Sequence, residues 1–408
     1  MKKINLFIEK KNCCGCGACY QSCPQNAILM VEDEKGGEYP EIDYEKCIGC
    51  GLCVKTCNYQ SLNKYNSLKE TYAAYSKSTN LKESASGGIF SSFAKSVLED
   101  DGIVYGAAMF YKNNKLEVQH IEITVIEDLI KLKGSKYVQS SCNQVYPKIK
   151  KQLEQGKIIL FSGTPCQVDG LYGYLKKEYK TLYTIEVICH GVPSQKLFND
   201  YIAHIESKRK IKIIDFKFRE KSKGWKLFGM LKYIDGNGNI NCDYFEPEES
   251  SYYQMFLNSY TYRENCYSCP YASKNRVANI TIGDYWCIDL VHPQYLKENG
   301  GMIDEHAGVS TMIINNVHGK LFFNEYGKNI ALFESTYKDA CRYNKQLIHP
   351  SILPSLRSKV FSMYEDAGYI KVEKWYKRRL LTIKIKRKLI SMIPKRIKDF
   401  MKKFLKKI

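Results

Sequence analysis

The sequence has few of the features that would carry a chain into or across a membrane as a helix. Its 408 residues contain no run of about 18 apolar residues, and the apolar run within residues 1–11 is too short for the core of a secretory signal. We therefore expect a cytoplasmic protein. Hydrophobic residues make up 44% and aromatic residues 13%, which excludes extensive disorder and suffices for the cores of two or three domains.

Acidic residues are also scarce. The chain has 43 Asp and Glu against 62 Lys and Arg, so its formal net charge is +19. Sixteen of the basic residues but only two acids lie within residues 371–408. A nucleic-acid-binding body should spread its basic residues over a folded face, so we expect no specific nucleic-acid binding and infer a basic tail.

The tail, residues 369–408, interleaves its Lys and Arg with apolar residues. Pro394 divides it into two short predicted helices, and the second has an apolar stripe formed by Phe400, Met401, Phe404, Leu405 and Ile408. Basic amphipathic helices are typical of segments that lie on an anionic membrane surface. We therefore expect peripheral contact with the inner face of the membrane, with a solvated tail or docking on another subunit as the alternatives.

Cysteine, by contrast, is abundant. A reducing compartment keeps cysteines as thiols, so the seventeen cysteines do not form a disulfide framework. Two runs of the form C-x2-C-x2-C-x3-C follow each other: Cys13, Cys16, Cys19 and Cys23, then Cys47, Cys50, Cys53 and Cys57. This is the bacterial two-cluster ferredoxin pattern, in which the last cysteine of each run binds the 4Fe-4S cluster of the other.

We therefore predict two ligand sets: Cys13, Cys16 and Cys19 with Cys57, and Cys47, Cys50 and Cys53 with Cys23. A pair of zinc knuckles is the alternative, but zinc has no use for a third cysteine at this spacing. Cys14 falls outside the pattern; we expect a spare thiol there, with a cluster-tuning role as the alternative. Asn58 follows Cys57 where Pro24 follows Cys23.

Beyond a polar linker at residues 63–70, the pattern predicts α/β structure. Residues 103–110 and 116–123 read as strands, and the apolar residues of 89–98 fall on one helical stripe. The small residues Ser86, Gly87 and Gly88 precede that helix and would let backbone N–H groups approach a phosphate, such as the pyrophosphate of a flavin or nucleotide. Plain turn chemistry is the commoner explanation for such a pair of glycines.

Residues 157–189 predict a βαβ unit. Two apolar strands, 157–161 and 181–189, flank a helix that begins at Pro165. Parallel strands of such a unit end at the same sheet edge, so Cys166 and Cys189 should converge.

A CxxC pair, Cys266 and Cys269, would complete a four-thiolate site with Cys166 and Cys189. We prefer a third 4Fe-4S cluster there, with zinc as the alternative. The remaining cysteines have no partner at ligand spacing and are expected to be packed or free thiols: Cys142, Cys242, Cys287 and Cys341.

The order of the motifs resembles the coenzyme F420 hydrogenase/dehydrogenase beta-subunit family with a fused two-cluster ferredoxin domain. After the ferredoxin runs and Ser86-Gly87-Gly88, the motifs are residues 134–140 (GSKYVQS), 163–168 (GTPCQV), 189–194 (CHGVPS), Phe218-Arg219 with Gly224-Trp225, the CxxC pair, and 283–286 (GDYW).

This resemblance implies an iron–sulfur flavoprotein oxidoreductase. Electrons would pass between 4Fe-4S clusters, FAD and a small-molecule substrate or two-electron carrier, and a ferredoxin or other redox protein would be the partner. The resemblance also implies that Cys166, Cys189, Cys266 and Cys269 hold the cluster beside FAD, and that the FAD surround includes Ser86, Gly87, Gly88, Lys136 and Tyr137. Stand-alone relatives suggest a role in polysaccharide biosynthesis; the alternative is an electron-carrier subunit that serves a partner enzyme and has no substrate of its own.

His190 and Asp284 stand beside these motifs and are candidate acid/base groups, with a structural hydrogen bond and a turn cap as the alternatives. Arg219, Arg276 and Trp225 would position an anionic substrate or the flavin, or else form salt bridges and a packed ring. Asn279 occupies a position where the resemblance leads us to expect an acid.

The predicted fold class is α+β / α/β, in five segments. A two-cluster ferredoxin-type domain (1–62) joins a mixed α/β flavin-binding domain in two parts (70–150 and 151–330), the second with the third cluster. A C-terminal extension (331–368) and the basic helical tail (369–408) follow.

Overall fold

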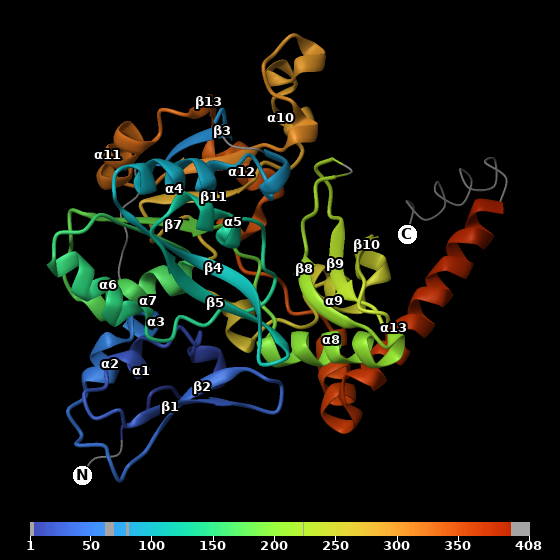
Figure 1. Cartoon of the computed structure of the whole chain (residues 1–408), viewed down its shortest axis with the longest axis horizontal. Helices are drawn as coiled ribbons and strands as arrows, with labels where there is room; N and C mark the ends of the chain where they lie inside the picture. Colours follow the sequence, from blue (N-terminus) through green and yellow to red (C-terminus); the bar gives the residue numbers. More distant parts are fainter. Residues whose placement is uncertain (1–3, 62–68, 79–80, 223, 393–408) are drawn as a thin grey trace, which may run out of the picture.

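The computed structural model describes residues 4–61, 69–78, 81–222 and 224–392, and the side chains of these residues up to 385. Figure 1 shows an N-terminal domain against one end of a larger α/β body, a small sheet beside the body, and a long C-terminal helix that runs outward. The mixed α/β fold with an N-terminal ferredoxin-like domain is as predicted.

The N-terminal domain pairs two strands with short helices. Strands β1 and β2 are antiparallel, and each cysteine run leads into a helix: β1 (Ile28–Glu32), β2 (Glu38–Ile42), α1 (Ala18–Gln21), α2 (Leu52–Thr56) and α3 (Asn58–Ser61). Gly17 and Gly51 cap α1 and α2 with φ of 76° and 70°, a conformation that favours glycine.

The body is built on one eight-stranded sheet with the order β13-β3-β12-β11-β7-β6-β4-β5. The strands β4, β6, β7 and β11 are parallel, and the others are antiparallel. Their bounds are β3 (Glu70–Ser76), β4 (Ile103–Lys112), β5 (Lys115–Ile123), β6 (Ile159–Gly163), β7 (Leu182–Val187), β11 (Ile280–Asp284), β12 (Ser310–Ile314) and β13 (Ile330–Ser335).

Helices cover both faces of this sheet. They are α4 (Ile89–Glu99), α5 (Leu129–Leu132), α6 (Val145–Glu154), α7 (Pro165–Leu175), α10 (Ile288–Val291), α11 (Val317–Tyr326) and α12 (Tyr337–Tyr343). The predicted strands 103–110 and 116–123 and the helix over 89–98 are confirmed by β4, β5 and α4. The βαβ prediction is confirmed by β6, α7 and β7, although β6 starts two residues later than predicted and β7 is shorter than 181–189.

Two predicted boundaries differ from the structure. Glu70, the last residue of the predicted linker, opens β3 and pairs with Ile314; the rest of that linker lies largely outside the described residues. Strand β13 is the edge strand of the body sheet, next to β3, so the predicted extension from residue 331 begins inside a body strand.

The small sheet and the C-terminal helix share an aromatic core. The sheet β8 (Lys212–Lys217), β9 (Gly229–Ile234) and β10 (Ile240–Phe245) packs with α8 (Gln195–Arg209), α9 (Ser251–Leu257) and α13 (Leu356–Met392). Buried members of this core include Phe198, Phe216, Tyr252, Tyr369 and Val372.

Helix α13 carries the start of the predicted tail. It bends at Ala367 and Gly368, where the backbone is not helical. Tyr369 and Val372 lie in the core, and the Tyr376 hydroxyl donates to Glu248 O at 2.7 Å, so the first turns of the tail are anchored on the body. The helix that we predicted before Pro394 is the part of α13 that follows this break, and its first turns pack on the body.

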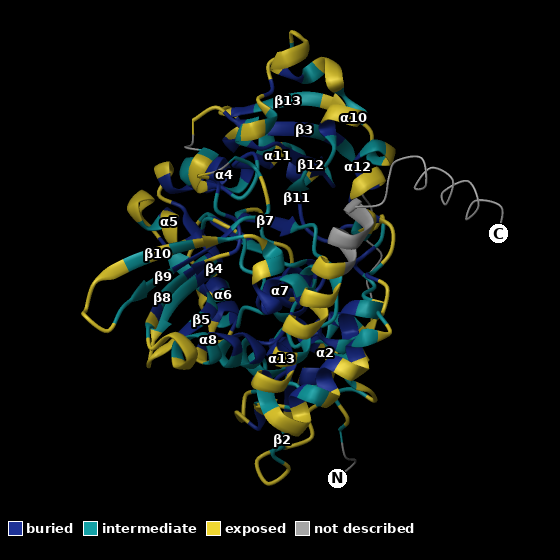
Figure 2. Ribbon diagram, turned by 90° about the vertical axis from the view of Figure 1, so that its right-hand side faces the viewer, coloured by how far each residue is buried: buried dark blue, intermediate teal, exposed yellow. Residues whose placement is uncertain are grey.

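The outer turns of α13 are exposed (Figure 2). Leu381 and Ile385 are 60% and 50% exposed. Pro394 and the predicted stripe from Phe400 to Ile408 lie outside the described residues. Among the described helices, none is both long enough and apolar enough to span a membrane.

Candidate functional site

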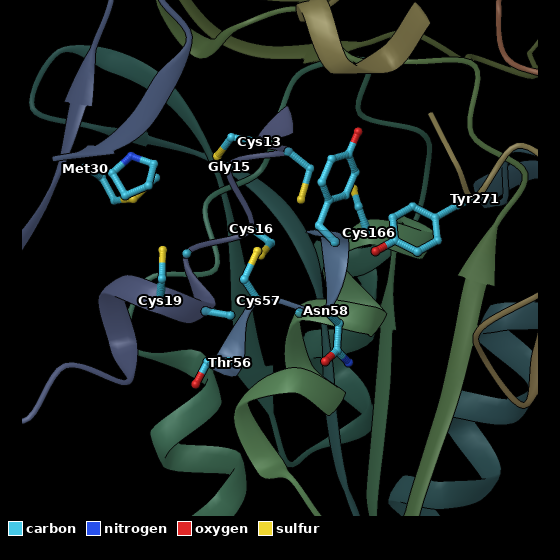
Figure 3. A pocket seen from close by; sticks show the side chains of 16 residues that line it. Cys13, Gly15, Cys16, Cys19, Met30, Thr56, Cys57, Asn58, Cys166 and Tyr271 are labelled. Carbon is cyan, nitrogen blue, oxygen red and sulfur yellow. The ribbon is translucent and has the colours of Figure 1, made fainter. Parts of the chain in front are cut away.

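Two cavities of the N-terminal domain separate its eight pattern cysteines into the predicted sets. The first cavity, which faces the body, is lined by Cys13, Cys16, Cys19 and Cys57, together with Cys14 and Cys166 (Figure 3). The second is lined by Cys23, Cys47, Cys50 and Cys53. The structure therefore brings together the cysteines that an exchange of the fourth ligand requires.

The donor chemistry of both cavities suits iron–sulfur clusters. The first is lined by six cysteines and the second by four, and at the second the Ala27 N–H donates to Cys23 Sγ at 3.3 Å. Burial raises the pKa of the Cys13 thiol to about 12, although the Arg263 charge opposes this. Burial also raises the pKa of Cys19 and Cys57. Metal ligation offsets such a cost because it binds the thiolate form.

A third group of cysteines meets at the edge of the body sheet. Cys166 stands in the first turn of α7, whose start is fixed by Thr164 and Gln167 in a capping box, and Cys189 follows β7. Burial raises the pKa of the Cys189 thiol well above its usual value, and the neighbouring thiols of Cys266, Cys166 and Cys269 raise it further.

This third group is thus close enough for its members to interact electrostatically. Among the residues that the structure describes, no group of three or more His, Cys, Asp or Glu side chains is arranged to hold a single metal ion.

Cys14, which we predicted to be a spare thiol, lies between two of these groups. It is 5% exposed, and its thiol donates to the sulfurs of Cys16 and Cys166. These hydrogen bonds lower the pKa of both acceptors, against the effect of burial. The first cavity and the third cysteine group are therefore adjacent.

Helix α7 is the surface on which the N-terminal domain rests. A Cβ at Gly170 would lie 2.9 Å from Cys16 Sγ, and a Cβ at Gly173 would lie 2.3 Å from the carbonyl oxygen of Thr56. Only glycine fits these two positions without displacement of a neighbour, so α7 is shaped for close approach of the domain.

A buried network joins the same surfaces. Asn58 Nδ2 donates to Asp169 Oδ1 at 3.0 Å, and the Tyr271 hydroxyl donates to Asp169 Oδ2 at 2.5 Å. Asp169 is fully buried on α7, and Tyr271 follows the CxxC pair by two residues. Asn58, where the sequence departs from the Cys-Pro pattern, thus ties the N-terminal domain to the body.

Arg276 forms a structural salt bridge rather than a ligand contact. Its Nε lies 2.5 Å from Glu186 Oε1, both side chains are at most 1% exposed, and its Nη1 donates to Tyr271 O at 2.8 Å. Glu186 is on β7 and also accepts from Thr281 Oγ1 at 2.7 Å. The pair therefore holds the loop after Cys269 on the strand that leads to Cys189.

A cavity of about 500 Å³ lies at the carboxyl ends of the parallel strands. Cys166 and Cys189 line it. So do six of the residues predicted to surround FAD or to act in catalysis: Ser86, Gly88, Lys136, Tyr137, His190 and Asp284. Gly87 does not; its N–H donates to Ser310 Oγ at 2.9 Å, and a Cβ there would lie 2.5 Å from Ala74 O. The absence of a side chain at Gly87 therefore lets the loop before α4 pack closely against β3 and β12.

Two lysines near this cavity have lowered pKa values. Burial of the Lys136 ammonium lowers its pKa to about 7, although the residue as a whole is partly exposed. Its Nζ donates to Lys133 O at 2.7 Å. Burial also lowers the pKa of Lys221 to about 8. Lys221 Nζ donates to Ser86 O at 2.6 Å and to Ala307 O at 2.7 Å. We did not predict Lys221, because nothing in the sequence around it links it to residue 86.

Asp284 acts as a counterion. Its carboxylate accepts from Arg219 at 2.7 and 3.4 Å and from Trp225 Nε1 at 3.3 Å. Burial tends to lower the pKa of Arg219, but Asp284 prevails and raises it. Trp225 stacks on Trp286 with centroids 5.3 Å apart, which is the packed ring that we gave as the alternative. The Asp284 carboxylate is thus engaged at the cavity wall.

Two histidines face the cavity. The His190 ring is accessible to solvent there, yet the surrounding protein desolvates its charged form and lowers its pKa. Burial lowers the pKa of His120 to about 4; its Nε2 lies 2.9 Å from Ser162 O and its Nδ1 3.1 Å from Ser140 Oγ. We did not predict a role for His120, because in the sequence it occupies an ordinary inward-facing position of the strand that became β5.

The structure also places Asn279 and the four cysteines for which we predicted no partner; Cys142 Sγ lies 3.4 Å from Nδ1 of the cavity residue His120. Asn279 Oδ1 accepts from Thr184 N at 2.8 Å, so the amide joins β7 to β11 inside the sheet. Of the cysteines without a predicted partner, Cys142 and Cys341 are buried, Cys287 is partly buried and Cys242 is exposed.

Comparison with known proteins agrees with this geometry. Residues 12–61 match the family model of the 4Fe-4S dicluster domain, which defines an iron–sulfur electron-transfer protein. Residues 71–146 and 156–339 match the N-terminal and C-terminal models of the coenzyme F420 hydrogenase/dehydrogenase beta subunit. The chain belongs to this oxidoreductase family and carries a 4Fe-4S dicluster domain at its N-terminal end.

Individual relatives are distant. Coenzyme F420-dependent sulfite reductase of Methanocaldococcus jannaschii is 27% identical over 197 residues, which are 47% of this chain and 30% of that protein. An uncharacterised ferredoxin of the same organism is 33% identical over 42 residues, 10% of this chain and 54% of its own length. The chain thus spans about a third and about half of these two relatives.

One solved structure, the F420-reducing [NiFe] hydrogenase complex from Methanosarcina barkeri, contains a chain with a TM-score of 0.40 and 16% identity. The match covers 75% of this chain and 94% of that one.

Proposed function

We propose that the protein is an FAD-dependent iron–sulfur oxidoreductase that exchanges electrons between a small-molecule substrate or two-electron carrier and its N-terminal clusters. One observation carries this proposal: Cys166 lines both the large cavity and the first cysteine cavity. A redox group in the large cavity would therefore lie next to the ligands of a cluster.

The large cavity suits FAD in its chemistry. Lys136 would supply positive charge for a phosphate, and Gly88, at φ 75°, starts the eleven-residue helix α4 whose first N–H groups bind anions well. Tyr137 and Phe256 supply stacked aromatic surface in the wall, with centroids 4.2 Å apart. When bound, a flavin takes two electrons at once and releases them singly, which suits clusters that accept one.

We assign three cluster sites by the grouping of sulfurs. The first N-terminal site would use Cys13, Cys16, Cys19 and Cys57, and the second would use Cys23, Cys47, Cys50 and Cys53. The third would use Cys166, Cys189, Cys266 and Cys269. The cavities and the mutual charge effects of these thiols support the assignment.

His190 is our candidate for proton transfer in the cavity. Its lowered pKa makes it neutral at pH 7, so the imidazole would be able to accept a proton from a bound substrate or carrier. Because Asp284 is engaged by Arg219, we assign it the role of fixing Arg219 and Trp225 at the wall.

The second candidate function is an electron-carrier subunit that serves a partner enzyme. The exposure of Cys50 and of the apolar side chains around it favours an exit for electrons at the second N-terminal site; Ile48, Leu52 and Val54 are 52%, 40% and 50% exposed. A ferredoxin or other redox protein would dock there. A substrate from polysaccharide biosynthesis stays a prediction.

Anaerobic purification with assays for iron, acid-labile sulfide, zinc and flavin tests these functions. About twelve irons and one FAD per chain are expected for three clusters and a flavin. About eight irons without flavin would favour the carrier subunit. Zinc without sulfide would refute both. Substrate turnover without any partner protein would distinguish the enzyme from the carrier.

We also propose that the end of the chain contacts an anionic membrane surface from the cytoplasmic side. The exposed Leu381 and Ile385 among basic residues support this. Deletion of residues 380–408 keeps the anchoring residues Tyr369, Val372 and Tyr376. The full chain should sediment with vesicles that contain phosphatidylserine and the truncated chain should not; equal sedimentation of the two would contradict the proposal.

A further inference from the structure

Arg263 is a buried cation at the junction of the N-terminal domain and the body. It precedes the CxxC pair and is 5% exposed. Its Nη1 donates to Gln139 Oε1 of the body at 2.9 Å, and its Nη2 donates to Glu38 O on β2 at 3.0 Å. The guanidinium also lies 4.4 Å from the ring centroid of Tyr39. Arg263 thus clamps the two parts together.

The charge of Arg263 has no carboxylate partner, unlike the charges of Arg219 and Arg276. Its hydrogen-bond acceptors are an amide and a backbone carbonyl, no ion pair of the described residues includes it, and its Nε is buried without an acceptor. The Glu38 carboxyl senses the charge but makes no ion pair with it. Burial of a charge without a compensating partner costs free energy, so negative charge close to the guanidinium should stabilise the folded protein.

That negative charge comes from the cysteine groups on both sides of Arg263. On one side Gln139, which accepts from Arg263, donates from its Nε2 to the carbonyl oxygens of Cys14 and Gly15 in the first cysteine run. On the other side the Cys266 N–H donates to the carbonyl oxygen of Arg263 at 3.1 Å, so the arginine adjoins the third group. Gly15, inside the first cysteine run, makes room: a Cβ there would lie 3.0 Å from the Nη2 of Arg263.

We propose that Arg263 is a positioning residue that supplies one positive charge to two clusters, the first N-terminal cluster and the third, and raises the reduction potential of both. The inference rests on the proposed ligand sets. Each cluster gains one negative charge when it accepts an electron, so a nearby fixed cation stabilises the reduced form. The second N-terminal cluster should be affected least, since its cavity is lined by none of the residues that Arg263 contacts, Glu38, Tyr39 and Gln139.

The test is an EPR-monitored redox titration of the anaerobically purified full chain, with iron and sulfide measured on the same samples. Arg263→Gln should lower the midpoint potentials of the first N-terminal cluster and of the third cluster, and leave the potential of the second N-terminal cluster unchanged. Arg263→Lys, which keeps the charge, should leave both potentials close to those of the unmodified chain. Arg209→Gln, at a surface ion pair with Asp243, serves as the control and should change none of the potentials.

If the Arg263→Gln protein does not retain its clusters, Gln139→Glu provides a second test. It would place a carboxylate on Nη1 and neutralise the charge while the side chain remains, so it should lower the same two potentials. Unchanged potentials in either variant at full iron content would overturn the proposal. Fewer than three clusters in the unmodified chain would instead count against the proposed function, and the shift of the first cluster would still decide the role of Arg263.

Discussion

Replacement of Gly173 by alanine tests whether the N-terminal domain is rigidly seated on α7. In an unobstructed helix this change stabilises by about 1 kcal/mol, because alanine is the better helix former. Here the new Cβ would lie 2.3 Å from the carbonyl oxygen of Thr56 and 3.1 Å from Asn58 Cγ, whereas ordinary contacts begin near 3.4 Å. The closest atom belongs to the backbone, so no side-chain rotation relieves the overlap.

The steric cost should therefore exceed the gain in helix propensity. Overpacking of a well-packed site costs about 1–3 kcal/mol, and a clash of a Cβ with a backbone carbonyl that no rotamer relieves belongs at the upper end of that range. We expect a net loss of about 1–2 kcal/mol, together with separation of α3 from α7. The chain should still bind its N-terminal clusters, because no cysteine is changed.

Hydrogen exchange and urea unfolding of the anaerobic holoprotein measure this effect. Gly173→Ala should speed exchange in residues 52–61 and lower the urea midpoint. Gly236→Ala, in the turn between β9 and β10 where a Cβ meets nothing within 4 Å, is the matched control and should change neither. An unchanged or higher midpoint with unchanged exchange in Gly173→Ala would refute the argument that α7 seats the domain by backbone contact.

Three further predictions concern the sites themselves. The Lys136 ammonium is present below its pKa of about 7 and lost above it, so FAD affinity, measured by flavin fluorescence, should fall as the pH rises from 6 to 9; the same fall in Lys136→Met would contradict this. Glu186→Gln leaves the Arg276 charge unpaired and should destabilise the protein by about 3–5 kcal/mol in denaturant unfolding, with loss of about four irons; normal stability would contradict the tie between β7 and the CxxC loop. Cys14→Ala should keep the full iron content and Cys13→Ala should not, and equal iron loss in both would make Cys14 a ligand.

Local spacing made the cysteine groups predictable from the sequence. Each ferredoxin run spans only eleven residues, and glycines with positive φ, such as Gly17 and Gly51, supply the turns that the spacing demands. The convergence of Cys166 and Cys189 followed from the rule that parallel strands end at one edge, and the structure places both at the same cavity.

Contacts between segments far apart in the sequence could not be predicted from it. Asp284 and Arg219 are 65 residues apart, and Asn58 and Asp169 are 111 residues apart, so neither pair leaves a periodic signal. The anchoring of α13 was missed for a related reason: its basic residues dominate the composition, while Tyr369 and Val372 add only two apolar positions to it. Gly87 was predicted by motif and found in a packing role, because a glycine pair does not reveal which of its members faces a ligand.

The residues that hold the N-terminal domain are also the residues that surround its first cysteine cavity. Asn58 adjoins Cys57, Gly170 faces Cys16, and Arg263 reaches past Gly15 to β2. Separation of the N-terminal domain from the body would expose or unpair the Asn58 amide and the Arg263 guanidinium, which costs free energy. A domain that delivered electrons by diffusion would have to pass through that separated state. The interface therefore fixes the first cysteine cavity beside Cys166, and under the proposed function it would give electrons a fixed path there, with a partner protein served at the exposed side near Cys50.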